Sequence, residues 1–351
     1  MTEKKGGRFS LTTKILIACA LILVLALGLT GLTYYLRYFG PNVTDNQEYL
    51  YIPTGSGFDD VVKTIKEKEI VKDTTTFIWS AENMDYTNRI KPGKYKLTAG
   101  MSNRRLINML KAGNQEPVKL RFQNIRLKED FAKFISTKIE ADSTALIHLL
   151  DSSAFVSNYG FNTENVYTMF IPNSYEMYWN LSAEQFFKRM YDEYQKFWTE
   201  ERKQKANEIG LNPIKVSILA SIVDAEALHD DEMPTIAGLY MNRYKKGVRL
   251  QADPTVIYAT KDFTIRRVLN KHLRVSSPYN TYQNTGLPPG PIMMPSINAI
   301  KAVLNYKKHD FLYMCAKEDF SGYHNFAVSE AEHRVNAKKF QAALNRMNIK
   351  K

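Results

Sequence analysis

The amino-acid sequence predicts an α+β protein with three parts: a membrane-spanning N-terminal helix, a small strand–helix–helix–strand unit, and a larger mixed α+β domain. Three observations predict this class. An uncharged run of 22 residues lies near the N-terminus. Strand-like stretches enclose two amphipathic stretches between residues 49 and 115. Beyond residue 116, helical and strand-like patterns alternate without an internal repeat, and 351 residues with 44% hydrophobic content suffice for two packed domains.

The uncharged run at 15–36 predicts a single transmembrane helix. At 1.5 Å per residue it is about 33 Å long, enough to cross the hydrocarbon core of a bilayer. Four basic residues lie within the tail at 1–14, whereas Arg37 alone follows closely. The positive-inside rule therefore places this tail in the cytoplasm and the rest of the chain outside. A cleaved signal peptide is the alternative, but the length of the run and its lack of a small-x-small cleavage site favour retention.

Charge and cysteine content narrow the classes of ligand. The net charge of +12 suits nucleic acid, an anionic wall polymer or a lipid surface, and the expected location outside the cytoplasm excludes nucleic acid. Of the two cysteines, Cys19 falls inside the apolar run, so we expect no structural disulfide and no zinc site with Cys315. The six histidines have no HExxH spacing, and we expect neither metal nor cofactor.

The elements after the apolar run define the remaining boundaries. A polar linker is expected at 37–48. The small unit at 49–115 is predicted to contain a strand at 49–53, helices at 58–69 and 73–84, a strand at 93–97, and a helix at 102–112 that Ser102 caps and Gly113 ends.

The domain expected at 116–351 opens with an alternating strand at 118–125. The patterns then predict two helical segments within 128–159, an aromatic-rich segment at 167–179, and helices at 183–209, 213–226 and 230–246. A short helix from Asp253 and an irregular Pro- and Gly-rich loop at 276–295 follow. The chain is expected to end with a helix at 296–306, two paired strands at 311–315 and 323–327, and a last helix at 330–347 with a capping box.

Glu226 is the main candidate for catalysis. Ile214, Ile218 and Ile222 recur every four residues and form one row on a helix, and Glu226 continues that row. Burial in this row would raise the pKa of the carboxyl, and a protonated carboxylic acid can protonate a leaving ether oxygen. Alternatively, the helix frays before Glu226 and the side chain is solvated. Asp224 lies about 200° further round the helix and is a poorer candidate.

Several further side chains are candidates for substrate contact. Gln251 has no capping role and offers both a donor and an acceptor. Asp253 precedes a proline and is better explained as a helix cap than as a catalytic group. The long loop at 276–295 is expected to act as a lid. Its members Asn280, Thr281 and Tyr282 carry hydrogen-bonding groups suited to the hydroxyl and acetamido groups of a sugar.

Four ordered blocks resemble the YceG-like (MltG) family of endolytic murein transglycosylases. They are ASIVDAE at 220–226, the pair Asn242-Arg243, RLQADPTVIY at 249–258 and YNTYQNTGLPPGPI at 279–292. The family's catalytic glutamate matches Glu226, while Asp224 replaces its other glutamate. The resemblance also implies a saccharide cleft containing Pro172, Asn173, Ser174 and Tyr175, where aromatic faces stack on sugar rings or simply form core. It further implies a YceG-like catalytic domain. The strand–helix–helix–strand order at 49–115 resembles a LysM-like module, which in such enzymes binds the glycan strand; a plain packing domain is the alternative.

The resemblance implies an enzyme of the bacterial cytoplasmic membrane. Its expected substrate is the peptidoglycan glycan strand, cut between N-acetylmuramic acid and N-acetylglucosamine to leave a 1,6-anhydro end, so that strand elongation ends. Peptidoglycan synthases are the implied partners. Two hypotheses remain beside it: a hydrolase with a carboxylate pair, for which Asp224 and Asp253 are the nearby candidates, and a glycan-binding scaffold without catalysis.

Overall fold

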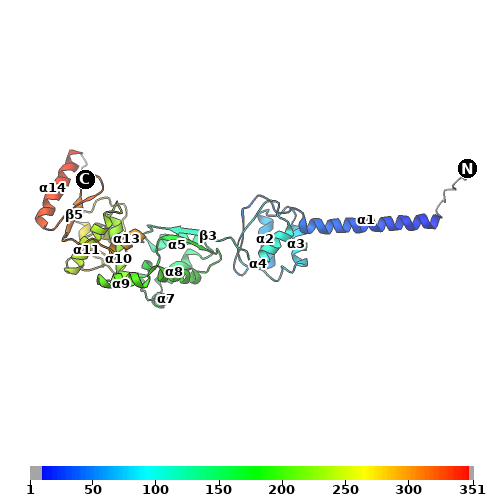
Figure 1. Ribbon diagram of the computed structural model, residues 1–351, viewed down its shortest axis with the longest axis horizontal. Coiled ribbons are helices and arrows are strands. Elements are labelled where there is room, and N and C mark those ends of the chain that lie inside the picture. Colours follow the sequence, from blue (N-terminus) through cyan, green and yellow to red (C-terminus); the bar gives the residue numbers. More distant parts are fainter. Residues whose placement is uncertain (1–9, 348–351) are drawn as a thin grey trace. The chain divides into compact units, whose positions relative to one another are not determined.

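The computed structural model describes residues 10–347 (Figure 1). It divides into two compact units. The first comprises the described residues up to Val118 together with Tyr178–Asn180, and the second comprises Lys119–Met177 and the described residues from Leu181 onward. Helices and two-stranded antiparallel sheets occur together, so the mixed α+β class is confirmed.

The apolar run forms helix α1, Leu11–Phe39, which is long and apolar enough to cross a membrane. None of its residues is buried. The helix extends beyond the predicted 15–36 at both ends. At its start, the Ser10 hydroxyl accepts a hydrogen bond from the Thr13 amide and caps the first turn. Part of the predicted tail at 1–14 is therefore helical, and residues 1–9 lie outside the described residues.

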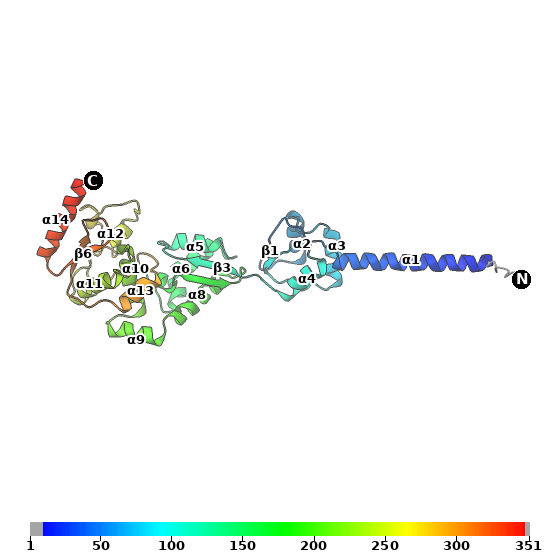
Figure 2. The ribbon, with the colours of Figure 1, turned by 45° about the horizontal axis from the view of Figure 1, so that its top comes forward.

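The first unit has its own hydrophobic core and a strand–helix–helix–strand order (Figure 2). Strands β1, Tyr49–Ile52, and β2, Gly93–Lys96, pair antiparallel. Helices α2, Phe58–Glu67, and α3, Thr74–Asn83, lie between them in the chain, and α4, Asn103–Ala112, follows. The expected caps of α4 are present: Ser102 accepts from the Arg105 amide, and Gly113 adopts the left-handed conformation.

The segment 37–48 is not the free linker that we expected. Helix α1 continues to Phe39, and Val43 is only 1% exposed within the core of the first unit. Its amide donates to Met101 O, and the buried Asn42 side chain donates to Asp73 O and Asn103 Oδ1. These bonds fix the segment because its polar groups are buried and need partners.

The N-terminal part of the second unit has more breaks than expected. Strand β3, Val118–Phe122, pairs with β4, Asn173–Met177. The region expected to hold two helices has three: α5, Lys128–Ser136, α6, Ser143–Asp151, and α7, Ser153–Ser157, before the 3₁₀ turn η1, Val166–Met169. The expected helix at 183–209 is two helices, α8, Ala183–Phe197, and α9, Glu200–Glu208, because Thr199 caps a new helix.

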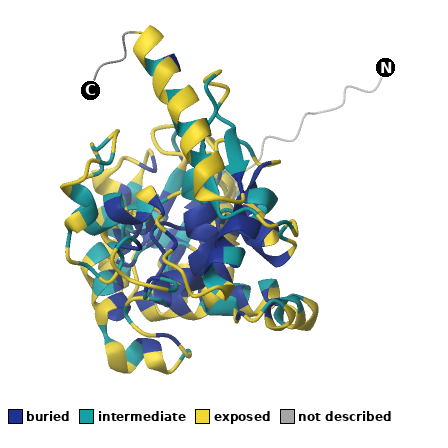
Figure 3. Cartoon of the chain, turned by 90° about the vertical axis from the view of Figure 1, so that its left-hand side faces the viewer, coloured by how far each residue is buried: buried dark blue, intermediate teal, exposed yellow. Residues whose placement is uncertain are grey.

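The C-terminal part of the second unit positions the candidate site. Helix α10, Pro213–Glu226, packs against α11, Met233–Lys245, and α13, Ile297–Leu304. Between them in the chain are α12, Asp253–Thr260, and the turn η2, His272–Arg274. Strands β5, Tyr313–Ala316, and β6, His324–Ala327, pair antiparallel, and α14, Glu330–Arg346, packs on them. Figure 3 shows α14 largely exposed and leading to the C-terminus.

Candidate active site

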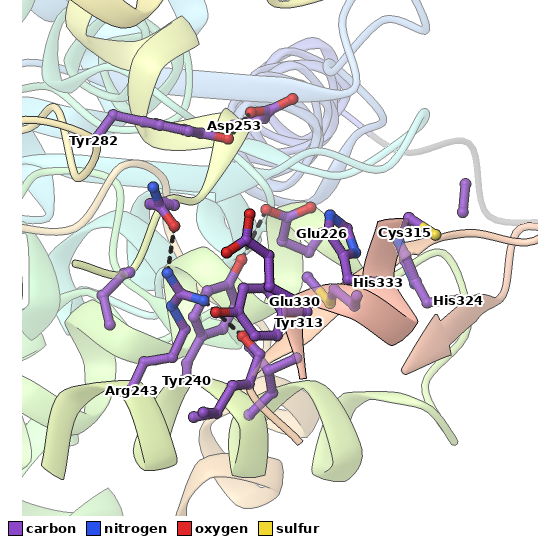
Figure 4. Close-up of a pocket in the computed structure, with 16 residues that line it drawn as sticks. Glu226, Tyr240, Arg243, Asp253, Tyr282, Tyr313, Cys315, His324, Glu330 and His333 are labelled. Carbon is purple, nitrogen blue, oxygen red and sulfur yellow. Dashed lines mark hydrogen bonds between the residues drawn. The ribbon is translucent and has the colours of Figure 1, made fainter. Parts of the chain in front are cut away.

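A cavity of about 670 Å³ in the second unit is lined by four of the side chains considered from the sequence: Glu226, Gln251, Asp253 and Tyr282 (Figure 4). Its wall comes from the end of α10, the buried face of α11, the start of α12, the β5–β6 hairpin and α14. The charged and ionisable side chains in this wall are Glu226, Tyr240, Arg243, Asp253, Tyr282, Tyr313, Cys315, His324, Glu330 and His333.

Glu226 is the last helical residue of α10, and its side chain lines the cavity. The helix does not fray before it, because the Ala227 amide donates to Val223 O at 3.0 Å. Burial, with a smaller contribution from the nearby Asp253 charge, raises the pKa of Glu226 from its ordinary value to about 7. The Tyr240 hydroxyl opposes this rise by donating to Glu226 Oε1 at 2.9 Å. Glu226 can therefore hold a proton near neutral pH.

Asp224 has a structural position away from the cavity. Its carboxylate accepts hydrogen bonds from the Ser296 amide at 2.9 Å and the Ser296 hydroxyl at 2.8 Å. Ser296 in turn caps α13, so Asp224 ties the last turn of α10 to the first turn of α13. Burial raises the pKa of Asp224, and the bonds from Ser296 act in the opposite direction.

Replacing Asp224 by asparagine should retain murein cleavage within a few fold. The amide oxygen can still accept from Ser296, while the lost charge-assisted bond should lower the free energy of unfolding by about 1 kcal/mol. Cleavage rates and thermal unfolding of the purified variant measure both effects. If Asp224→Asn proves as inactive as Glu226→Gln while remaining folded, Glu226 is not the sole acid.

Asp253 is a second carboxylate in the cavity wall, and its interpretation as a helix cap is wrong. Ala252 occupies the N-cap position of α12, and Asp253 is the first helical residue with no side-chain capping bond. Proline at the second helical position explains the shift, since helices favour proline in their first turn. Asp253 Oδ1 instead accepts from the Tyr282 hydroxyl at 2.6 Å. Burial, together with Asp253, raises the pKa of Tyr282 and keeps it a donor.

Arg243 and Gln251 form a polar pair in the same wall. Arg243 donates through Nη2 to Gln251 Oε1, through Nε to Arg249 O at 2.8 Å and through Nη1 to Leu312 O at 2.6 Å. It is 7% exposed, and within residues 10–347 it has no ion pair with a carboxylate. Gln251 has a φ of 54°, an uncommon conformation for a non-glycine residue, which holds its amide in the cavity wall.

His324 lines the cavity from β6, beside the buried carboxylate of Glu232. Its Nδ1 lies 2.7 Å from Glu232 Oε2, and its backbone amide donates to Glu232 Oε1 at 2.8 Å. Glu232 thereby fixes the orientation of the imidazole ring. The second ring nitrogen is left for another partner.

Comparison with known proteins identifies the family. The model of the YceG-like family matches residues 50–339. The chain belongs to the YceG-like family. A relative named endolytic murein transglycosylase, from Bacillus subtilis, is 29% identical over 318 residues, covering 84% of this chain and 85% of its own length. One of the same name from Streptococcus pneumoniae is 26% identical, and the match spans 59% of that longer relative.

The solved structures include one of the same family. The crystal structure of a putative YceG-like protein from Listeria monocytogenes is similar with a TM-score of 0.55 and 26% sequence identity. The similarity covers 82% of this chain and 98% of that one. The resemblance inferred from the four sequence blocks is thus confirmed at the level of family.

Some residues expected to contact substrate lie elsewhere in this YceG-like chain. Asn280 is fully buried and donates to Leu273 O and Val275 O, and Thr281 is bonded to the Ala252 amide and Thr255. Both shape the backbone around Tyr282, which alone of the three lines the cavity. The loop at 276–295 is anchored near its C-terminal end, where the Ile292 amide donates to the buried Ser221 hydroxyl, and its role as a lid stays a prediction.

The Pro-Asn-Ser-Tyr segment does not line the main cavity; Pro172 precedes β4, and Asn173, Ser174 and Tyr175 are its first three residues. Tyr175 is buried, donates to Ile171 O at 2.5 Å and stacks on Phe122, so it is a core residue. Asn173 and Ser174 are exposed and line a separate cavity of about 330 Å³ in the second unit.

Two polar residues of the cavity were not singled out from the sequence. Tyr240 was not named there, and Arg243 appeared only as part of a family motif. They are three residues apart and therefore share the face of α11 that Glu226 contacts. This spacing was a usable signal. No such signal pointed to Tyr313, Glu330 or His333, because the hairpin and α14 reach the cavity only through tertiary packing.

Proposed function

We propose that this chain is an endolytic murein transglycosylase, with Glu226 as its catalytic acid and base. The observation that carries the proposal is the Glu226 carboxyl in the cavity wall, with its pKa raised to about 7 and its Oε1 held by Tyr240. The names of the Bacillus and Streptococcus relatives support the same activity. The proposed substrate is the glycan strand of peptidoglycan.

The reaction needs one carboxyl group, which acts first as an acid and then as a base. Protonated Glu226 gives its proton to the oxygen that joins C1 of N-acetylmuramic acid to N-acetylglucosamine, and that C1–O bond breaks. The 6-hydroxyl oxygen of the same muramic acid then bonds to C1, and its proton returns to the Glu226 carboxylate. Intramolecular attack has a high effective molarity, and no water is consumed. The product carries a 1,6-anhydro end.

Neighbouring side chains suit this sequence of steps. Tyr240 remains a donor at every working pH, because burial and Glu226 both raise its pKa. It can stabilise Glu226 while the carboxyl is ionised between the two proton transfers. The Arg243–Gln251 pair and Tyr282 supply donors and acceptors for hydroxyl and acetamido groups.

Hydrolysis is the second candidate, because Asp253 shares the cavity with Glu226. Two carboxyl groups that flank a glycosidic bond can cleave it with water, one as the acid and the other as base or nucleophile. The position of Asp253 in the wall, rather than at a helix cap, favours considering this mechanism. A glycan-binding scaffold without catalysis is the third hypothesis.

Digestion of purified murein in oxygen-18 water tests the proposal. We expect anhydro-muropeptides without oxygen-18 at the new muramic acid end, because the attacking oxygen comes from the sugar. Mass spectrometry of the products measures the label. A labelled, reducing muramic acid end as the main product would establish hydrolysis and assign Asp253 as the second carboxylate. Uncleaved murein would leave the scaffold hypothesis.

The location and partners belong to the same proposal. Helix α1 is proposed to anchor the chain in the bacterial cytoplasmic membrane, with the N-terminus in the cytoplasm and Glu226 outside. The first unit is proposed to be LysM-like and to hold glycan, which its strand–helix–helix–strand order supports. Cleavage near peptidoglycan synthases would then end the elongation of nascent strands.

A further inference from the structure

The first unit contains a basic cavity that the proposed catalysis does not use. Its volume is about 800 Å³, and its wall includes Phe39, Lys96, Met101, Arg104, Arg105 and Asn108. No aspartate or glutamate lines it. Among the described residues, none of the three cations in its wall has an ion pair, although Arg104 lies over the Phe39 ring, 5.0 Å from its centroid. The cavity therefore carries uncompensated positive charge.

The cavity is fixed to the end of the apolar helix. Phe39 is the last residue of α1 and forms part of the wall. The carbonyl of Arg37 accepts from the Ser80 hydroxyl at 3.1 Å and from the Asn103 side chain at 2.9 Å. These bonds join the last turn of α1 to α3 and α4 inside the first unit (Figure 1). The arginines of α4 consequently keep a constant position relative to the end of α1.

Aromatic side chains mark the level at which α1 would leave a membrane. Tyr34 and Tyr38 contact Trp79 edge to face, with ring centroids 4.7 and 5.2 Å apart. Such rings favour the interface between hydrocarbon and water. The uncharged run ends at Leu36, so Phe39 lies only about 5 Å further along the helix axis. The basic cavity would then open at the level of the lipid headgroups.

The position of the arginines within α4 also favours an anion. Arg104 and Arg105 are the second and third helical residues, where the helix dipole is positive and acidic side chains are usual. Two cations at this end of the helix are unfavourable when no anion is bound, and a bound phosphate would offset their positive charge. A neutral sugar would not offset this charge. A headgroup bound here could extend its acyl chains along the exposed apolar surface of α1.

We propose that this cavity binds the phosphate of an anionic lipid headgroup in the leaflet that faces the first unit. The proposal rests on the membrane anchoring proposed above, and not on the cleavage chemistry. A phosphate group is common to anionic lipids and to soluble phosphate, so a test must separate these two sources.

The test uses the full chain in a neutral detergent, with native mass spectrometry to count bound lipids. The probes are phosphatidylglycerol, phosphatidylcholine and inorganic phosphate. We expect wild type to prefer phosphatidylglycerol, and Arg104→Gln/Arg105→Gln to reduce its affinity for that lipid roughly 30-fold. The matched control, Lys63→Gln/Lys66→Gln, removes the same charge from the exposed face of α2 and should keep wild-type affinity.

Three outcomes would overturn the proposal: unchanged affinity in the double arginine variant, an equal loss in the lysine control, or competition by inorganic phosphate at concentrations equal to those of the lipid. Should the double variant fail to fold, Lys96→Gln provides a second test, because Lys96 is exposed at the end of β2. Murein cleavage is not the readout, so failure here leaves the proposed catalysis standing, and an inactive enzyme would leave lipid binding measurable.

Discussion

Replacing Glu226 by glutamine should lower the rate of murein cleavage by roughly 10³-fold or more, the upper part of the range for a general acid and base. The amide has nearly the same shape, and its oxygen can still accept the bond from Tyr240. It has no acidic proton for the leaving oxygen and cannot take one from the 6-hydroxyl. Product formation from purified murein, followed by chromatography of released muropeptides, measures the loss.

A stability measurement shows that such a loss comes from chemistry and not from unfolding. The pKa of Glu226 is about 7 when folded against an ordinary 4.5, so the folded protein holds this proton more tightly than the unfolded chain. Ionisation therefore destabilises the wild type as pH rises from 4.5 to 7, with the full cost above 7. The free energy of unfolding of Glu226→Gln should exceed that of wild type by about 3 kcal/mol at pH 8.5 and should be about equal to it at pH 4.5.

Two results would contradict this assignment. Retained cleavage by Glu226→Gln would remove the residue from the reaction. Lower stability of the variant at pH 8.5 would show that the ionised carboxylate is favoured in the folded protein, contrary to its burial. Asp224→Asn is the matched control, since it neutralises a carboxylate in the same helical turn outside the cavity.

Cleavage should also fall by about tenfold for each pH unit above 7, because only protonated Glu226 can act as the acid. Between pH 7 and pH 9 the loss reaches about 50-fold, because half of the Glu226 carboxyl groups are already ionised at pH 7. In Tyr240→Phe the decline should begin at higher pH, since the lost hydroxyl no longer stabilises the ionised carboxylate. Rates measured across pH 5–10 under subsaturating murein locate the decline in each protein.

The direction of the shift distinguishes a positioning role for Tyr240 from a merely structural one. A structural role would lower the rate at every pH and leave the onset of the decline unchanged. A decline that begins at lower pH in Tyr240→Phe would mean that the hydroxyl stabilises the protonated form, which the observed donation to Glu226 Oε1 does not support.

Local signals were sufficient to predict most of the first unit. Its helices are short and amphipathic, and their ends carry explicit caps such as Ser102 and Gly113. The failures occurred where a boundary depended on one weak signal. Thr199 begins a new helix inside a charged stretch, and Val43 is drawn into the core by partners distant in sequence. Such tertiary hydrogen bonds leave no periodic pattern.

The sequence predicted the place of Glu226 in the cavity wall, but it predicted few of the residues that surround it. Glu226 continued an apolar row, but residues from Val216 to Val223 are buried on every side of α10, so burial alone would not have selected one face. The family motif made the choice. Asp253 was misassigned because an Asp-Pro pair fits both the cap and the first helical turn. His324 and Tyr313 depend on how the hairpin packs, which spacing in the sequence does not reveal.

The bonds from Ser80 and Asn103 to Arg37 O have a consequence for rotation about the axis of α1. Each residue added to a continuous helix turns everything beyond it by 100° and advances it by 1.5 Å. Because α1 passes into the first unit without a flexible joint, the length of the helix sets the direction of that unit about the helix axis and its height along it. Inserting one residue after Leu36 would turn Arg104 and Arg105 by more than a quarter of a circle, whereas a seven-residue insertion would nearly restore their direction at greater height.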